Sequence, residues 1–295
     1  MSKKYSRYKV DASELGSLMS REQGNNPASE KDLIDFIHII NKDFIDITTR
    51  QKQTVLEIIS KTVNYDPESL TMTIKKSMYE QYAFGQFGIN KVSATNTKPF
   101  QLEKGEIGEL AAIRLLSKID GVEYQKNTKL FSSEHLKGIP DIITYDGDKI
   151  TGVKEIKVPL DFISFLEKVD NDISPEDLWE IRAYMEILKL PEAEVCYCLV
   201  DMPDKQKEKK LADQTDILTL LGYTPEHIRR KIKQLEKSMS YGYIPDYQKV
   251  RRFRVERKGW FTNQMRKRVL LVRKKMNQLH NKFINPLVLL ETNQE

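Results

Sequence analysis

Two carboxylates and a lysine, Asp141, Glu155 and Lys157, lie within one short stretch of the sequence, residues 138–157, whose pattern predicts a β-hairpin. Carboxylate oxygens are the ligands that hard cations such as Mg²⁺ prefer. A bound cation lowers the pKa of a water molecule and neutralises charge on a phosphate. Because side chains alternate along a strand, Glu155 and Lys157 share a face, while Ile156 points the other way. These residue types predict metal-dependent cleavage of phosphodiesters. The alternative is a solvated hairpin with exposed charges.

The turn of this hairpin decides whether Asp141 faces the same way as Glu155. A two-residue turn at residues 146–147 would pair Asp141 with Gly152 and point Asp141 away from Glu155. A three-residue loop at residues 146–148 restores a common face, and so does a bulge at Gly152. The predicted metal site therefore requires one of these two geometries.

Four further stretches resemble motifs of one known family, in the same order. They are Asp11–Leu15 (Asp-Ala-Ser-Glu-Leu), Gly105–Glu109 (a G-x-x-x-E helix), Trp179–Met185 (W-Q-x-Q-x-Y-M in the family) and Val195–Pro203 (a "Y-C-L-V-D-x-P" strand). Together with the hairpin, they resemble the phage lambda-exonuclease family of PD-(D/E)XK nucleases, also called YqaJ-type viral recombinases. The resemblance is continuous from about residue 100 to 204 and patchy elsewhere.

This resemblance implies an α/β fold, with a PD-(D/E)XK restriction-endonuclease-like core of a mixed central sheet flanked by helices, plus helical additions. It implies a DNA exonuclease that resects double-stranded ends 5′ to 3′ in phage-type recombination, in the cytoplasm of a bacterial host. A ring-shaped homo-oligomer and a single-strand annealing protein as partner are implied as well. Two alternatives remain: an endonuclease on the same fold, and a catalytically weakened DNA-binding protein.

The family's catalytic roles carry over to five positions. Asp141 and Glu155, with the carbonyl of Ile156, would bind one or two Mg²⁺ ions, for which Mn²⁺ may substitute. Glu109 would complete the site, and Lys157 would orient or help to deprotonate the attacking water.

Other positions match the family less closely. Ser13, with Arg7, would hold the 5′ phosphate of the DNA end, although Ser13 is equally well interpreted as a plain helix N-cap. Glu180 and Tyr184 would support the site, but Glu180 and Arg182 stand where the family has glutamines. A carboxylate only accepts hydrogen bonds, so Glu180 would either approach the metal or pair with Arg182.

The 295 residues carry a formal charge of +5, and the basic residues are unevenly distributed. Residues 251–275 contain eleven Lys or Arg and one acid, Glu256. We therefore predict that Arg251, Arg252 and Arg254, on a strand at 249–255, contact DNA phosphates. A solvated basic face is the alternative.

Cysteine and histidine point to no further chemistry. Cys196 and Cys198 alternate on a predicted strand and lack the partners of an iron–sulfur cluster, so we predict core packing. The four histidines are scattered, and neither an apolar run of membrane-spanning length nor a signal-peptide core is present.

Hydrophobic periodicity predicts the remaining elements. Helices are expected within 29–84 (three), at 103–118, 160–169, 175–190, 213–238 (two, broken at Gly222 and Pro225) and 262–281. Strands are expected at 123–129, 139–145, 150–158 and 193–201, and a charged linker at 204–210. The chain is predicted to comprise an N-terminal helical region (1–99), a catalytic core (100–204) and a basic C-terminal region (205–295).

Overall fold

The computed structural model describes residues 5, 8–20, 28–42, 46–63, 66, 68–89 and 100–284, with side chains described for all of these except 30 and 100–107. The chain forms two compact units. One contains Lys9–Ser13 and Val92–Asn263; the other contains Met1–Tyr8, Glu14–Lys91 and Gln264–Glu295. These units differ from the three consecutive segments expected from the sequence. Most of the last helix, from Gln264 onward, belongs to the unit that contains the N-terminal helices.

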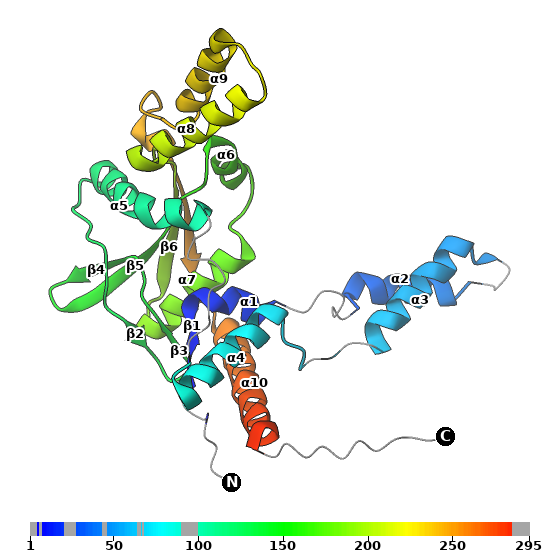
Figure 1. Ribbon diagram of the computed structural model, residues 1–295. Helices are drawn as coiled ribbons and strands as arrows, with labels where there is room; N and C mark the ends of the chain where they lie inside the picture. Colours follow the sequence, from blue (N-terminus) through cyan, green and yellow to red (C-terminus); the bar gives the residue numbers. More distant parts are fainter. Residues whose placement is uncertain are drawn as a thin grey trace. The chain divides into compact units, whose positions relative to one another are not determined.

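A four-stranded mixed sheet forms the centre of the first unit (Figure 1). Its strands are β4 (Ile142–Asp146), β5 (Lys149–Lys157), β6 (Glu192–Cys198) and β7 (Val250–Glu256), in this spatial order. The pairs β4–β5 and β6–β7 are antiparallel, and β5–β6 is parallel. The parallel pair requires a crossover, which α6 (Phe162–Asp170) and α7 (Pro175–Leu188) provide. The predicted strands 139–145, 150–158, 193–201 and 249–255 are confirmed.

Helices cover both faces of this sheet. Helix α5 (Phe100–Asp120) packs on the face of Ile156, where its buried residues and both cysteines form one apolar cluster: Ala112, Ile113, Leu116, Cys196 and Cys198. Helix α7 covers the other face, since Glu180 reaches Lys157 there. Core packing of the cysteines is confirmed, and so is the mixed α/β class.

A bulge in the β4–β5 hairpin sets the direction in which Asp141 points. The loop consists of Gly147 and Asp148, and the register shifts at Thr151, which has no partner on β4. Beyond the bulge Ile142 pairs with Lys154, so one further step along the strands places Asp141 opposite Glu155. Without the bulge, Asp141 would lie opposite Lys154 and face away from the site.

These findings correct both geometries that the sequence left open. The loop has two residues rather than three, and the bulge lies at Thr151 rather than Gly152. Gly152 instead makes room for Thr144 on the opposite strand, because a Cβ at position 152 would lie 2.6 Å from Thr144 Oγ1. The common face of Asp141 and Glu155 is nevertheless present.

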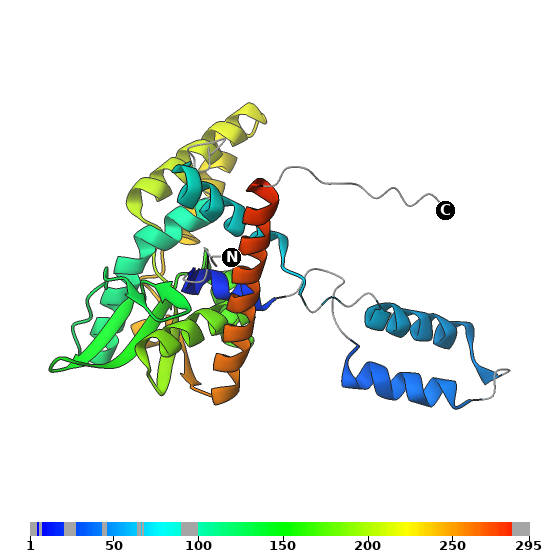
Figure 2. The ribbon, with the colours of Figure 1, turned by 90° about the horizontal axis from the view of Figure 1, so that it is seen from below.

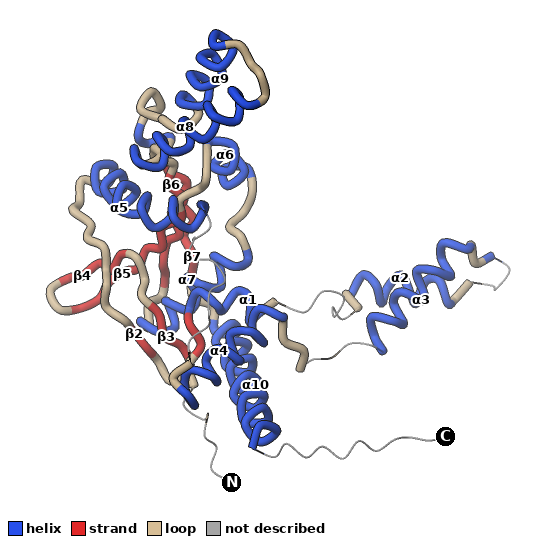
Figure 3. The backbone as a smooth tube through the Cα atoms, viewed as in Figure 1, coloured by secondary structure: helices blue, strands red, loops and turns tan. Residues whose placement is uncertain are grey.

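A second, smaller sheet consists of β1 (Val10–Asp11), β2 (Phe131–Ser132) and β3 (Leu136–Gly138), in the order β1-β3-β2. The strand predicted at 123–129 is wrong. Figure 3 shows this segment as an irregular loop between α5 and β2. The side-chain amide of Asn127 donates to the carbonyl oxygens of Pro140 (2.8 Å) and Lys129 (3.1 Å), and these bonds take the place of a regular strand ladder.

The charged linker predicted at 204–210 is also wrong, because this segment begins α8 (Asp204–Leu220). Its lysines, glutamine and glutamate all have high helix propensity. Helix α9 (Pro225–Lys237) follows after Thr224, whose hydroxyl caps it, and the predicted break between the two helices is confirmed. A short 3₁₀ turn, η3 (Asp246–Gln248), precedes β7.

The second unit is helical. It contains α1 (Leu15–Met19), α2 (Glu30–Ile40), α3 (Thr49–Val63), α4 (Met72–Phe87) and most of α10 (Gly259–Ile284). The 3₁₀ turn η1 (Ala12–Glu14) precedes α1. The three predicted helices within 29–84 are confirmed, and α2 and α3 lie side by side (Figure 2). In the described part of the chain, no helix is both long and apolar enough to cross a bilayer.

Candidate active site

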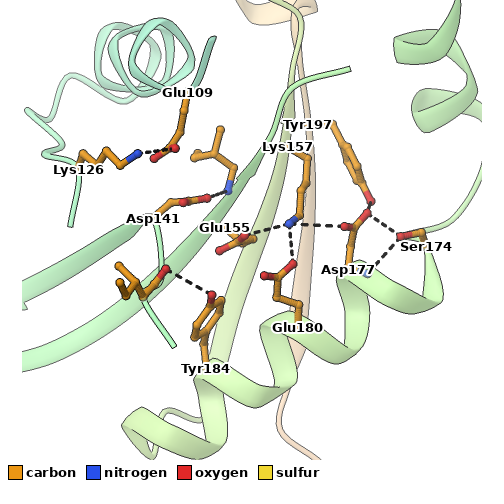
Figure 4. Close-up of polar contacts among 12 residues, drawn as sticks. Glu109, Lys126, Asp141, Glu155, Lys157, Ser174, Asp177, Glu180, Tyr184 and Tyr197 are labelled. Atoms are coloured by element: carbon orange, nitrogen blue, oxygen red, sulfur yellow. Dashed lines mark hydrogen bonds and ion pairs between the residues drawn. The ribbon is translucent and has the colours of Figure 1, made fainter. Parts of the chain in front are cut away.

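Asp141 and Glu155 lie together at the base of the hairpin (Figure 4). The backbone N–H of Ile156 donates to Asp141 Oδ2 over 2.7 Å, which fixes the Asp141 side chain beside β5. Glu155 is 5% exposed, and its Oε2 is buried without a hydrogen-bond partner. A partly buried carboxylate, Asp141, and a buried one, Glu155, are therefore held side by side, and Glu155 Oε2 has no hydrogen-bond partner.

Lys157 connects the hairpin to α7. Its ammonium donates to Glu155 Oε1 over 2.9 Å and to Glu180 Oε2 over 2.6 Å, and Asp177 Oδ1 lies 3.7 Å away. Asp177 is held in turn by the hydroxyl groups of Tyr197 and Ser174. Lys157 is thus surrounded by three carboxylates (Figure 4).

The structure excludes one of the two interpretations of Glu180, its pairing with Arg182. Glu180 pairs with Lys157 and not with Arg182. The Arg182 guanidinium lies against aromatic rings instead, with its carbon 4.8 Å from the Trp179 ring and 5.2 Å from the Trp260 ring. Of these two residues, Glu180 therefore enters the site, while Arg182 packs against the rings of Trp179 and Trp260.

Glu109 reaches the same cluster from α5. Its Oε2 accepts a hydrogen bond from the ammonium of Lys126 over 2.6 Å, and its Oε1 is buried without a partner. The charge of Glu109 acts on Asp141, since it contributes to raising the pKa of that carboxyl. The four acidic or basic residues predicted as catalytic, Glu109, Asp141, Glu155 and Lys157, are thus brought together.

Burial dominates the electrostatics of the site. It raises the pKa of Asp141 to about 7, against the opposing hydrogen bond from Ile156. Burial also raises the pKa of Glu155 well above its usual value, and the neighbouring Asp141 and Glu180 add to this rise. Burial alone would lower the pKa of Lys157, but Glu155, Glu180 and Asp177 raise it. The carboxylates outnumber the ammonium groups, so the site favours additional positive charge.

The carboxylate oxygens of Glu109, Asp141 and Glu155 are the kind of ligand that a hard divalent cation prefers. Buried carboxylate oxygens without partners, on Glu109 and Glu155, are costly unless a cation or proton satisfies them. In this conformation, however, the described residues include no group of three or more Asp, Glu, His or Cys side chains arranged to hold a metal ion. Lysine ammonium groups occupy Glu109 and Glu155 instead. Each of these two carboxylates keeps its other oxygen without a partner, and a cation bound there would lie close to the lysine and repel it.

Tyr184 supports the segment that leads to Asp141. The hydroxyl of Tyr184 donates to the carbonyl oxygen of Ile139 over 3.3 Å and so holds the segment before Asp141. Gly138 permits this contact, because a Cβ there would lie 2.8 Å from Tyr184 Cε1 and 2.9 Å from Ala12 Cβ.

Ser13 is exposed in the 3₁₀ turn before α1. The N-cap of α1 is Glu14, which makes no side-chain cap hydrogen bond, so the plain-cap interpretation of Ser13 is wrong.

The three arginines predicted to bind phosphate separate by sheet face. Arg252 and Arg254 lie on the face of Ile156 and bind the carboxylates of Asp120 and Glu192. Only Arg251 is level with Lys157 on the catalytic face: it pairs with Tyr197, which pairs with Lys157. We therefore keep Arg251 alone of the three as a candidate phosphate contact. Arg7 lies outside the described residues.

Sequence reasoning missed Asp177 and Lys126. Asp177 has a recognisable local signal, since Ser174 and Pro175 mark a helix start and Ser174 caps the Asp177 amide. That signal predicts a helix boundary but not a contact with Lys157. Lys126 has no such local signal: it lies in the segment predicted as a strand, and no motif in that segment predicts its contact with Glu109.

The raised carboxyl pKa values predict how stability depends on pH in the absence of metal. Asp141 titrates at 3.8 in its ordinary environment and at about 7 in the folded protein. Between these values the folded state binds more protons than the unfolded state, so the free energy of unfolding falls as pH rises through this window. We expect the melting temperature in EDTA to be lower at about pH 7.5 than at about pH 5.5, and the fall to be smaller in Asp141→Asn. An equal fall in both proteins would contradict the assignment.

Comparisons with known proteins support the fold. No protein-family model matches the sequence, and no curated protein matches it either. Among solved structures, a phage-related exonuclease from Haemophilus somnus 129PT matches with a TM-score of 0.54 and 17% identity, over 94% of this chain and 97% of that one. The alkaline exonuclease LHK-Exo from Laribacter hongkongensis matches with a TM-score of 0.50 and 13% identity, over 95% of both chains. A structure of LHK-Exo in complex with dAMP matches with a TM-score of 0.50 and 12% identity, again over 95% of both chains. The chain therefore has the mixed α/β fold of these phage-related and alkaline exonucleases.

Proposed function

We propose that this protein is a metal-dependent deoxyribonuclease of the PD-(D/E)XK type. The observation that carries the proposal is the convergence of Glu109, Asp141 and Glu155 with Lys157. The fold shared with exonucleases supports the same conclusion. The pairing of Asp141 with Glu155 across a bulge-shifted register adds to it, because two acids held on one face are what a cation site needs.

Each residue has a defined task in this proposal. Asp141 and Glu155, with the carbonyl of Ile156 and with Glu109, would hold Mg²⁺ or Mn²⁺. A bound cation would supply charge neutralisation at the phosphate and a more acidic water. Lys157 would orient the attacking water, and its charged form is favoured by three carboxylates. Glu180 keeps the Lys157 ammonium over the site, while Tyr184 holds the loop before Asp141.

The resemblance in sequence suggests how this chemistry is used. We propose 5′-to-3′ resection of double-stranded DNA ends in phage-type recombination within a bacterial host. We also propose a ring-shaped homo-oligomer that works with a single-strand annealing protein. The dAMP complex of LHK-Exo supports a nucleotide-sized ligand for this fold.

Linear and closed circular duplexes test the proposal directly. Purified protein with Mg²⁺ should degrade the linear duplex to nucleotides and leave the closed circle intact. Nicking of circles would instead indicate an endonuclease, and binding without cleavage would indicate a catalytically weakened DNA-binding protein. A duplex labelled at one 5′ end and, separately, at one 3′ end then gives the polarity. Early release of 5′ label as mononucleotide supports the proposed direction.

Ser13 is proposed to contact the terminal 5′ phosphate, since its hydroxyl is exposed and does not cap α1. We expect Ser13→Ala to slow digestion of 5′-phosphorylated ends while hardly changing digestion of 5′-hydroxyl ends. Initial rates on the two substrates measure this. Equal slowing on both ends, or equal rates on both for the unmutated protein, would contradict a phosphate contact at Ser13.

A further inference from the structure

The irregular segment Lys126–Lys129 is fixed to Pro140 and Asp141, the two residues just before β4. The backbone N–H of Asn127 donates to the carbonyl oxygen of Asp141 over 2.8 Å. Its side-chain amide donates to the carbonyl oxygen of Pro140 over 2.8 Å, and its Oδ1 accepts from the N–H of Lys129 over 3.1 Å. Asn127 thus holds this loop segment against the residues just before β4, and Lys126 pairs with Glu109 of the site (Figure 4).

This anchored segment presents two ammonium groups to solvent. Lys129 is exposed, and among the described residues it has no carboxylate partner; its ammonium contacts the ring of Phe131, 5.3 Å from the centroid. The Lys126 side chain is 39% exposed and pairs with Glu109. An exposed ammonium without a carboxylate partner, such as that of Lys129, is available to an anionic ligand.

We propose that the segment Lys126–Lys129 is a DNA-backbone contact site, in which the two lysines bind phosphates flanking the bond that is cut. This inference rests on the proposed nuclease function and adds a binding site to it. The ligand class is the phosphodiester backbone of the DNA strand entering the catalytic site. Ammonium groups bind phosphate as point charges and carry no sequence information, as a nuclease without base preference requires.

Lys126 has a second role that Lys129 lacks. Its ammonium lies 2.6 Å from Glu109 Oε2. A cation held by Glu109 would lie close to this ammonium and repel it. Lys126 and a divalent cation therefore compete for Glu109. A cation held by Glu109 would repel the Lys126 ammonium and free it to contact DNA, which would couple metal binding to DNA contact through this ion pair.

Three lysine-to-methionine variants separate these roles: Lys126→Met, Lys129→Met and, as a control of equal charge change, Lys209→Met at an exposed position of α8. Affinity for a blunt 20-base-pair duplex is measured by fluorescence anisotropy over a range of salt concentrations, in EDTA and in Ca²⁺. In Ca²⁺ we expect Lys126→Met and Lys129→Met each to reduce the slope of log affinity against log salt by about 0.9. In EDTA only Lys129→Met should do so, and Lys209→Met should change neither slope.

Calorimetric Mn²⁺ titration without DNA gives an independent readout. Lys126→Met should bind Mn²⁺ about two- to five-fold more tightly, as expected for the loss of a partly exposed ion pair, and Lys129→Met should bind it as the unmutated protein does. Slopes for both variants equal to that of Lys209→Met would overturn the DNA contact. Unchanged or weaker Mn²⁺ binding by Lys126→Met would overturn the competition.

These outcomes are distinct from failure of the proposed function. If the unmutated protein cleaves DNA but the slopes do not change, the inference alone is wrong. If the slopes fall as expected but no cleavage occurs with any divalent cation, the segment binds DNA and the proposed nuclease function is wrong. Because both lysines are exposed, melting temperatures within error of the unmutated protein are expected and confirm that the variants fold.

Discussion

Asp141→Asn and Glu155→Gln should each reduce the rate of DNA cleavage by at least about 10³-fold, equivalent to about 4 kcal/mol of transition-state stabilisation. Each change removes a carboxylate charge from a buried position and preserves the size of the side chain. The reason for the loss is that an amide oxygen is a much poorer ligand for a hard cation than a carboxylate. DNA affinity should persist, because neither carboxylate contributes positive charge to the binding of phosphate.

Steady-state cleavage of a linear duplex and anisotropy on the same duplex measure these two quantities. Asp148→Asn serves as the matched control, since Asp148 is exposed in the loop of the same hairpin. The control should cleave at the rate of the unmutated protein. More than a tenth of that rate in Asp141→Asn or Glu155→Gln would rule out the assignment of this hairpin as the metal site.

Lys157→Met should lower turnover by about 10²- to 10⁴-fold, the range typical of a positioned proton-transfer or orienting group. The variant loses an ammonium that contacts both Glu155 and Glu180. Mn²⁺ binding, followed by calorimetry, should remain, because Glu155 then loses a competing cation rather than a ligand. Loss of Mn²⁺ binding together with turnover would indicate that Lys157 maintains the structure of the site instead.

Glu180→Gln tests whether the charge of Glu180 is needed or only its contact with Lys157. The amide keeps an oxygen that accepts from Lys157 and restores the residue type found in the family that the sequence resembles. We expect this variant to retain activity within about tenfold of the unmutated rate, which corresponds to about 1.4 kcal/mol. A loss as large as that of Lys157→Met would show that the charge of Glu180 is needed, for example as a ligand, and not only its acceptor oxygen.

Much of the fold was predictable because the periodicity of apolar residues is local. The strand that follows Asp141, the strands carrying Glu155 and Cys196, and the helix carrying Glu180 are predicted by the sequence and are present. Two segments are predicted wrongly, for different reasons. The segment 123–129 takes its conformation from a distant bond between Asn127 and Pro140, and the charged residues 204–210 have the propensity of a helix but not the apolar stripe that marks one.

The sequence by itself determined which residue types were available for catalysis, and the alternation along β5 placed Glu155 and Lys157 on one face. Only the tertiary structure decided that a bulge at Thr151 turns Asp141 towards them, that Glu180 takes Lys157 as its partner, and that Arg252 and Arg254 are occupied by Asp120 and Glu192. The physical reason is that side-chain direction within one strand follows from backbone geometry over two residues, whereas register and ion pairing depend on groups brought together from distant parts of the chain.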